Sequence, residues 1–288
     1  MSPFGQQLDT FIQAAEKGCM LRLAPTPSGF LHAGNALNFI FNWLVARSKN
    51  GRLLLRIDDL DGDRKRSAYV QDVFESLHWL GLDWEEGPHN ESDFEQNWSQ
   101  HHRLSLYHGE LQKLRETGLL FACRKSRSDL ALYGFQYPET YREQGLSLDD
   151  PDVAWRIRTP KDFPMPDFIV RRRDGLPAYQ IASMVDDVHF GVSDAIRGSD
   201  LEASTQAQRF LAQCTNNDKF LNINFLHHPL LLDAEGEKLS KSAGSASLQA
   251  MRTAGLSPKT IFRQSADLLG IPAGTIKTAQ NLLNFFRG

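Results

Sequence analysis

The first 60 residues alternate between helical and strand-like spacing of apolar side chains. Residues 5–18 carry them three and four positions apart, which predicts an amphipathic helix. The apolar run at 20–24 predicts a strand that a Pro-Thr-Pro segment ends, and helical spacing then extends from Gly34 to about Asn50. The continuous apolar stretch at 53–57 is typical of a buried strand in a parallel sheet. These elements form a strand–helix–strand unit, the building block of a doubly wound α/β fold.

The rest of the chain follows a less regular pattern. Helices are predicted at 67–80, at 101–117 and from Ala178 onward, and strands at 154–158, 168–170 and 225–232. Segment 124–152 is rich in Ser, Asp, Gly, Pro and Tyr and lacks clear periodicity, so we interpret it as an insertion. The residues after Ser242 carry the pattern of short helices.

Composition limits the class of protein. Apolar residues make up 41% of the chain, enough for a sizeable core, and no run approaches the roughly 20 apolar residues that a membrane-spanning helix needs. The first 20 residues include charged side chains where a signal peptide has its apolar centre. Cys19, Cys123 and Cys214 lie far apart, which argues against a disulfide framework. We therefore expect a cytoplasmic protein without a membrane partner.

The net charge of −3 gives the chain no general attraction to nucleic acid. A local basic cluster at Arg171, Arg172 and Arg173 is an exception, although such runs are most often solvated surface. An RNA-binding role therefore needs support from other features of the sequence.

The segment from Arg22 to Asn35, RLAPTPSGFLHAGN, lies where the first predicted strand turns into a helix. Ligands of open α/β sheets bind at such carboxyl ends of strands. The helix N-terminus offers N–H groups to phosphate, His32 can donate to phosphate oxygens, and Gly34 leaves room for a nucleotide. These features suit ATP. A packed histidine beside a capping glycine would explain the same residues if the segment stood alone.

A second segment, from Glu237 to Ser242, follows the strand predicted at 225–232 and reads EKLSKS. Lys238 and Lys241 lie three positions apart on this loop, where their ammonium groups can neutralise a leaving pyrophosphate. A loop of lysine and serine is, by itself, most often solvated surface. The two segments together, in this order and far apart on an α/β pattern, are much more specific than either one.

Both segments resemble the signature motifs of class I aminoacyl-tRNA synthetases. His32-Ala33-Gly34-Asn35 is similar to the HIGH motif, and Lys238-Leu239-Ser240-Lys241-Ser242 is similar to KMSKS. Within that class, other stretches resemble the glutamyl group, and these are 22–29, 56–61 with Arg64, 172–179, 185–187 and 196–201.

The resemblance implies a class I Rossmann-type doubly wound parallel sheet with an inserted α/β subdomain. We expect an N-terminal helical extension at 1–19, a catalytic domain at 20–245 with the insertion at about 118–180, and a short helical C-terminal region at 246–288. The residues after the lysine loop are too few for the helical anticodon-binding region of a complete glutamyl-tRNA synthetase, so we expect no such domain.

The chain looks most like the short paralogues of this group, the glutamyl-queuosine tRNA(Asp) synthetases. That resemblance implies activation of L-glutamate to glutamyl-adenylate with ATP and Mg²⁺, and transfer of glutamate to the queuosine base in the anticodon of tRNA(Asp). It also makes the basic cluster a candidate RNA contact. Three alternatives stay open: a truncated glutamyl-tRNA synthetase that charges an ordinary acceptor end, a non-catalytic nucleotide- or RNA-binding paralogue, and a different nucleotidyltransferase.

The resemblance also assigns roles to the matching positions. Catalysis by charge stabilisation falls to His32, Asn35, Lys238 and Lys241, and ATP binding to His32, Gly34, Asn35, Leu239 and Lys241. Glutamate binding falls to Arg22, Ala24, Ser28, Asp58, Tyr179 and Arg197. Arg22 then meets the side-chain carboxylate, Arg197 lies near the α-carboxylate, and Asp58 faces the ammonium group. Alternatively, Arg22 forms a structural salt bridge with Asp58 or Asp59.

Three features depart from the family pattern. Asp58 is one methylene shorter than the glutamate that the family has in its Arg-Ile-Glu-Asp stretch. Many relatives hold zinc in the insertion with cysteines and a tyrosine, whereas here Cys123 is accompanied by Lys125 and Tyr141 near the other expected positions. Since one thiolate cannot hold a structural zinc ion, we expect none. The N-terminal helix has no counterpart in the pattern.

Overall fold

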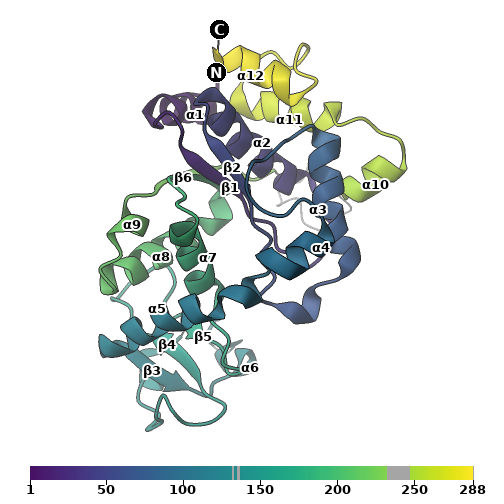
Figure 1. Cartoon of the computed structure of the whole chain (residues 1–288). Coiled ribbons are helices and arrows are strands. Elements are labelled where there is room, and N and C mark those ends of the chain that lie inside the picture. Colours follow the sequence, from purple (N-terminus) through teal and green to yellow (C-terminus); the bar gives the residue numbers. More distant parts are fainter. Residues whose placement is uncertain (132, 135–136, 232–246, 288) are drawn as a thin grey trace. The chain divides into compact units, whose positions relative to one another are not determined.

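The computed structural model describes residues 1–131, 133–134, 137–231 and 247–287 (Figure 1). The chain forms two compact units. The first comprises 1–99, 191–201 and 223–288, and the second comprises 100–190 and 202–222.

The first unit contains two pairs of parallel strands. Its strands are β1 (Met20–Leu23), β2 (Arg52–Leu55), β6 (Asp194–Gly198) and β7 (Asn224–His228). Its helices are α1 (Pro3–Ala14), α2 (Ala33–Ser48), α3 (Ser67–Leu80), α4 (Glu91–Asp93), α10 (Leu248–Thr253), α11 (Lys259–Leu269) and α12 (Ala279–Arg287), with short helical turns η1 (Gly62–Arg64), η2 (Phe94–Trp98) and η5 (Ser199–Leu201). β1 pairs with β2, and β6 pairs with β7. The parallel pairing, with helices between the strands, confirms the predicted α/β class.

The two strand pairs meet where β1 and β6 begin. The backbone N–H of Ser193 donates to the Met20 carbonyl at 2.9 Å, and the Met20 N–H donates to Ser193 Oγ at the same distance. Deeper in the unit, the side-chain amide of Asn42 on α2 bonds the backbone of Ile196 on β6. Its oxygen accepts from the Ile196 N–H and its nitrogen donates to the Ile196 carbonyl, each at 3.0 Å. This fully buried amide thus occupies the place of a partner strand for Ile196.

Helix α2 is apolar around most of its circumference because other elements cover it on several sides. It contacts strands β1, β2 and β6 as well as helices α11 and α12 (Figure 1). Its buried side chains belong to one core that also includes residues of β1, β2, α3, α11 and α12. A helix that is buried on most faces in this way carries a nearly continuous apolar sequence rather than a single stripe.

Helix α1 belongs to the same core. Its buried residues Phe4, Leu8 and Ile12 pack in that cluster. Ser2, the N-cap of α1, donates from its backbone N–H to the Leu269 carbonyl at 2.9 Å. The start of the chain therefore lies against the end of α11 (Figure 1). Gly270 has φ +62° there, and a Cβ at this position would meet the Ser2 nitrogen at 2.3 Å, so a side chain is excluded.

The second unit is built around an antiparallel sheet of order β3-β4-β5. Its strands are β3 (Leu120–Cys123), β4 (Ala154–Ile157) and β5 (Ile169–Arg171). Its helices are α5 (Leu104–Glu116), α6 (Arg127–Ala131), α7 (Tyr179–His189), α8 (Glu202–Cys214) and α9 (Asp218–Leu221), with turns η3 (Gln100–Arg103) and η4 (Glu139–Tyr141).

A fully buried carboxylate ties the helices of the second unit together. Asp186 on α7 accepts from Arg103 Nε at 2.8 Å, from the Tyr107 hydroxyl at 2.8 Å and from Gln100 at 2.9 Å. A buried charge needs such partners, and these three satisfy it within one unit. Burial and the neighbouring Asp186 carboxylate raise the pKa of the Tyr107 hydroxyl, which stays protonated and donates.

Most predicted elements occur, with differences at their ends. The helix predicted at 67–80 coincides with α3, whereas the strand predicted at 225–232 ends at His228. Pro229 follows there, and proline lacks the N–H that a strand interior needs. Residue 232 lies outside the described residues. Strand β3 was not predicted, since its four apolar residues directly precede a segment without periodicity.

Candidate functional site

The carboxyl ends of β1 and β2 are joined by backbone hydrogen bonds. The parallel register places Arg22 opposite Leu54. Beyond the strands, the Arg56 N–H donates to the Leu23 carbonyl at 2.8 Å, and the Asp58 N–H donates to the Pro25 carbonyl at 2.9 Å. The end of β1 and the segment after β2 therefore lie side by side. Half-buried Ala24 follows β1, and half-buried Ser28 follows in the loop.

Asp58 forms a buried, two-pronged ion pair with Arg56. Arg56 Nε donates to Asp58 Oδ1 at 2.6 Å, and Arg56 Nη2 donates to Oδ2 at 3.0 Å. The two side chains are 2% and 6% exposed. Sequence reasoning missed this pairing, although residues two apart on an extended backbone point to the same side. A carboxylate has about four acceptor positions, so a carboxylate of this kind can accept more bonds than the two from Arg56.

His32 and Asn35 form a reciprocal cap at the N-terminus of α2. His32 Nδ1 accepts from the Gly34 N–H at 3.1 Å, and Asn35 Oδ1 accepts from the His32 N–H at 3.1 Å. An accepting Nδ1 assigns the proton of a neutral imidazole to Nε2, which is then a donor. A Cβ on residue 34 would meet His32 Cε1 at 3.1 Å. A methyl group at this position would therefore press on the histidine ring, which would have to shift by a few tenths of an ångström.

Arg197 lies near the carboxyl end of β6 and is 2% exposed. Its guanidinium carbon stands 4.7 Å from the centre of the Phe225 ring on β7, which gives a cation–π contact. The preceding residue, Ile196, is held by Asn38 and Asn42 of α2. The helix that begins after His32 and the strand that carries Arg197 are thus linked directly.

The first unit therefore brings together most of the predicted site residues. Arg22, His32, Gly34, Asn35, Asp58 and Arg197 all lie at strand ends or at the start of α2 within that unit. Tyr179 belongs to the second unit, where it is the first residue of α7 and is 41% exposed. The predicted residues Lys238, Leu239 and Lys241 lie outside the described residues.

The basic cluster lies on a hairpin after β5. The Arg172 N–H donates to the Leu176 carbonyl at 2.8 Å, which closes the turn. Arg172 forms an ion pair with Asp174 at 2.7 Å, and Arg171 stacks 4.8 Å from the centre of the Trp155 ring. The cluster is therefore on the surface of the second unit, as a phosphate contact requires, although Asp174 offsets part of its charge.

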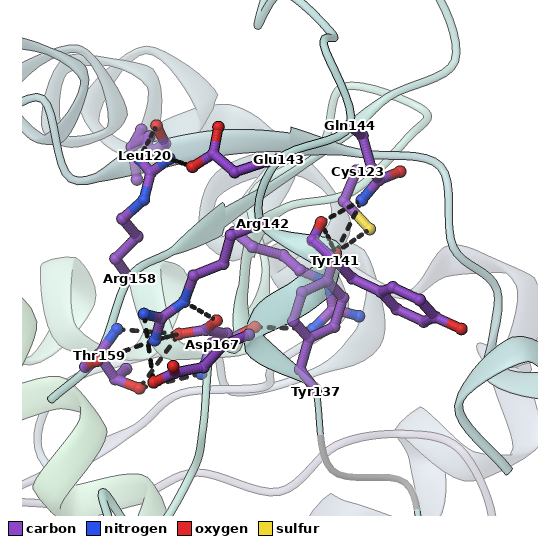
Figure 2. A network of polar contacts seen from close by, with 12 residues as sticks. Leu120, Cys123, Tyr137, Tyr141, Arg142, Glu143, Gln144, Arg158, Thr159 and Asp167 are labelled. Atoms are coloured by element: carbon purple, nitrogen blue, oxygen red, sulfur yellow. Dashed lines mark hydrogen bonds and ion pairs between the residues drawn. The ribbon is translucent and has the colours of Figure 1, made fainter. Parts of the chain in front are cut away.

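The Cys123 thiol lies in a hydrogen-bonded cluster (Figure 2). Its sulfur accepts from the Tyr137 hydroxyl at 3.1 Å and from the Lys125 N–H at 3.3 Å. Burial raises the pKa of this thiol, but hydrogen bonds from Tyr137, Gln144 and the Lys125 N–H outweigh burial and hold the pKa below its usual range. The Lys125 ammonium stands 4.5 Å from the centre of the Tyr141 ring.

These residues do not fit a structural zinc ion. The cluster supplies one thiol, two phenols, an amide and a lysine cation, whereas a structural zinc ion needs four ligands, most of them thiolates or imidazoles. Among the residues that the structure describes, no group of three or more His, Cys, Asp or Glu side chains is arranged to hold a metal ion. Over the same part of the chain, no helix is long and apolar enough to cross a membrane.

Comparisons with known proteins agree with this arrangement. The catalytic-domain model of the tRNA synthetases class I (E and Q) matches residues 19–133 and 138–284. A protein named glutamyl-Q tRNA(Asp) synthetase from Parasynechococcus marenigrum is 40% identical over 91% of this chain and 87% of its own length. One of the same name from Synechococcus sp. strain CC9605 is 38% identical over 88% of this chain and 83% of its own length.

A solved structure supports the same fold. The glutamate-tRNA synthetase of Elizabethkingia anophelis superposes with a TM-score of 0.75 at 21% identity. The match covers 92% of this chain but 65% of that synthetase, so the chain corresponds to about two thirds of its length. From the family model and the identity to these relatives, the chain belongs to the class I tRNA synthetases (E and Q), and it is a ligase of the aminoacyl-tRNA synthetase type.

Proposed function

We propose that the protein activates L-glutamate with ATP and transfers it to the queuosine base in the anticodon of tRNA(Asp). The observation that carries this proposal is the pair of buried arginines at strand ends of the first unit. Arg22 and Arg197 are each less than 5% exposed. Glutamate has two carboxylates and one ammonium group, so two guanidinium groups and the Asp58 carboxylate match its charges. The names of the relatives supply the queuosine acceptor.

The chemistry has two steps in which atoms balance. An oxygen of the α-carboxylate attacks the α-phosphorus of ATP, and pyrophosphate leaves, which gives glutamyl-adenylate. A hydroxyl of the RNA acceptor then attacks the glutamyl carbonyl carbon and loses its proton, and AMP leaves. The first step needs positioning and charge stabilisation rather than a side-chain nucleophile. Mg²⁺ enters with ATP as part of the substrate.

Particular residues have defined tasks in this scheme. His32 donates from Nε2 to a phosphate oxygen, and Asn35 fixes the histidine through the capping bond. Lys238 and Lys241 neutralise the leaving pyrophosphate, and the family resemblance assigns Leu239 to ATP binding with them. Ala24 and Ser28 line the glutamate site beside Asp58. The assignment of Tyr179 to glutamate stays a prediction from the family resemblance.

Free cysteines suit the reducing cytoplasm, where we place the reaction.

Sequence identity supports the queuosine acceptor over the main alternative. The chain is 40% identical to a relative named glutamyl-Q tRNA(Asp) synthetase and 32% identical to one named glutamate–tRNA ligase. A truncated glutamyl-tRNA synthetase that charges an ordinary acceptor end is the second candidate, because the catalytic domains of both groups are alike.

Two assays test the proposal. The first screens all amino acids for ATP–pyrophosphate exchange without RNA, and we expect exchange with glutamate alone. The second follows labelled glutamate on tRNA(Asp) with and without queuosine. Label that depends on queuosine and survives removal of the terminal adenosine supports the proposal, and label that disappears with that adenosine indicates the alternative.

A matched pair of variants connects the assays to the site. His32→Ala removes an N-cap and a phosphate donor, whereas Ser2→Ala removes an N-cap of α1 that accepts from the Gly5 N–H at 3.0 Å. Both lose a capping bond, which typically costs about 1 kcal/mol of stability. We expect His32→Ala to lose exchange and Ser2→Ala to keep it. Equal exchange by the two variants contradicts the role of His32.

A further inference from the structure

The second unit contains a cavity of about 730 Å³ at the N-terminus of α7. This volume is within the range of sites that hold a small organic ligand. Apolar side chains form much of its wall, among them Pro164, Met165, Phe168 and Ile169. Three side chains with polar groups, Arg156, Tyr179 and Gln180, also line it. The combination of apolar walls and a few polar groups is typical of a binding site rather than of a packing defect.

Two buried polar atoms of this wall lack a hydrogen-bond partner within the described residues, and these are Arg156 Nε and Gln180 Oε1. The rest of each side chain is held in place. Arg156 Nη1 donates to the Asp167 carbonyl at 2.7 Å, and its guanidinium stacks 4.2 Å from the centre of the Tyr137 ring. Gln180 Nε2 donates to Ser204 Oγ at 3.1 Å. Each residue is more than nine-tenths buried. Each residue thus brings to the cavity wall one polar group without a described partner, a donor from Arg156 and an acceptor from Gln180.

The wall of the cavity continues into a positively charged segment. Residues 156–173 contain six basic side chains and two acidic ones. One of the acids, Asp167, is buried and paired with Arg142 at 2.6 Å. Glu143 and Asp174 pair with Arg158 at 3.2 Å and with Arg172 at 2.7 Å, and they offset part of the positive charge of the segment. The N-terminus of α7 adds the positive end of a helix dipole. A ligand with a polyanionic backbone is favoured at this entrance.

We propose that this cavity receives a nucleobase that is unstacked from a single-stranded segment of the RNA substrate. A nucleobase is flat and apolar on its faces, and its edge carries neighbouring acceptor and donor groups. The Arg156 Nε–H meets the acceptor, Gln180 Oε1 meets the donor, and the basic segment holds the flanking phosphates. Single-stranded loops are the parts of RNA whose bases proteins extract and read in this way. The inference rests on the proposed function, because that function supplies the RNA partner.

The first test fills the cavity. Met165→Trp inserts a large side chain into the wall, and Leu221→Trp places the same side chain at a half-buried residue of the same unit, at the end of α9 and outside the cavity wall. The full chain is assayed with a hairpin that carries the queuosine anticodon loop. We expect Met165→Trp to lower hairpin affinity and the kcat/KM of transfer at least about 10-fold, and to leave glutamate-dependent exchange unchanged. Leu221→Trp should match the wild type.

The second test removes the acceptor. Gln180→Met deletes the oxygen at similar size, and Gln180→Glu keeps an oxygen there. In Gln180→Met the base keeps a buried donor without an acceptor, so we expect the KM for RNA to rise about 5- to 100-fold. The change in Gln180→Glu should be smaller. Hairpins with 2-aminopurine at each loop position in turn identify the base, because its fluorescence rises when it leaves the stack.

The outcomes separate the inference from the proposed function. Wild-type RNA affinity and transfer in Met165→Trp and Gln180→Met overturn the inference. A raised KM for glutamate or ATP in Met165→Trp also overturns it, since the cavity would then belong to the adenylate-forming site. If the wild type shows no exchange or no transfer, the proposed function is wrong, and the hairpin affinities of the same variants still decide whether the cavity takes a base.

Discussion

Replacing Asp58 by asparagine should change both the stability of the fold and the binding of glutamate, and the two effects can be measured separately. In the folded protein Asp58 accepts two hydrogen bonds from Arg56, and both side chains are almost inaccessible to water. Removing one partner of a buried ion pair typically costs about 3–5 kcal/mol, because the other charge stays buried without compensation. Asparagine keeps one acceptor oxygen, so one of the two bonds can persist. We therefore expect Asp58→Asn to lower the free energy of unfolding by about 3 kcal/mol.

Urea unfolding at neutral pH measures this loss. Natural domains have about 5–15 kcal/mol of stability, so the variant should remain folded at 25 °C. Asp149→Asn is a suitable control, since Asp149 also pairs with an arginine, Arg115, but its side chain is 67% exposed. An exposed pair is worth about 0–1 kcal/mol. If Asp58→Asn lowers the free energy of unfolding by no more than Asp149→Asn does, the ion pair of Asp58 with Arg56 does not behave as a buried pair. That result refutes the prediction.

The same variant tests the substrate contact. Loss of the negative charge should raise the KM for glutamate in the exchange assay sharply, with a smaller effect on kcat. Asp58→Glu should lower that KM if the pocket accepts one more methylene, because the carboxylate then extends further toward the ammonium group. An unchanged KM in Asp58→Asn assigns the ammonium to another acid, for which Asp59 is the first candidate.

Other predictions concern the motifs, the cysteine cluster and pH. His32→Ala and Lys241→Ala should each lower glutamate-dependent exchange about 100- to 1,000-fold while circular dichroism stays unchanged. Gly34→Ala should also lower exchange, because its methyl group presses on the His32 ring. Elemental analysis should find no stoichiometric zinc, and one zinc per chain would contradict our view of Cys123. Burial lowers the pKa of His228 below its usual 6.5, so the unfolded chain binds the proton first as pH falls. The free energy of unfolding should therefore decrease below about pH 6.5, with a shallower slope in His228→Leu.

The sequence predicts the first strand–helix–strand unit and helix α3 well, because local pattern and final packing agree there. The helix predicted at 67–80 is α3, and the helix expected from Gly34 begins at the His32 cap. Apolar runs of four or five residues between turn signals were sufficient to locate β1 and β2. The motif residues also lie where a strand–helix–strand unit places them, at the carboxyl ends of strands.

The side-chain contacts that position the site residues could not be predicted from the local sequence pattern. Asn42 and Ile196 are 154 positions apart, and nothing in the local pattern marks a buried asparagine as the partner of a distant strand. The Arg56 and Asp58 pair has a local signal in its spacing, but the same spacing allows each side chain to contact substrate. Strand β3 depends on pairing with β4, which follows more than 30 residues later, so its short apolar run is ambiguous by itself.

The bond between Asn42 and Ile196 has a consequence for how the site responds to ligands. It links the helix that starts at His32 to the strand that carries Arg197, so neither group can move far without the other. Their mutual arrangement is set when the chain folds, and substrate does not have to create it. If glutamate binds there as proposed, we expect its binding to cost the protein little conformational freedom. Calorimetry should accordingly show a small heat-capacity change, and Asn42→Leu, which breaks the link, should weaken binding through entropy.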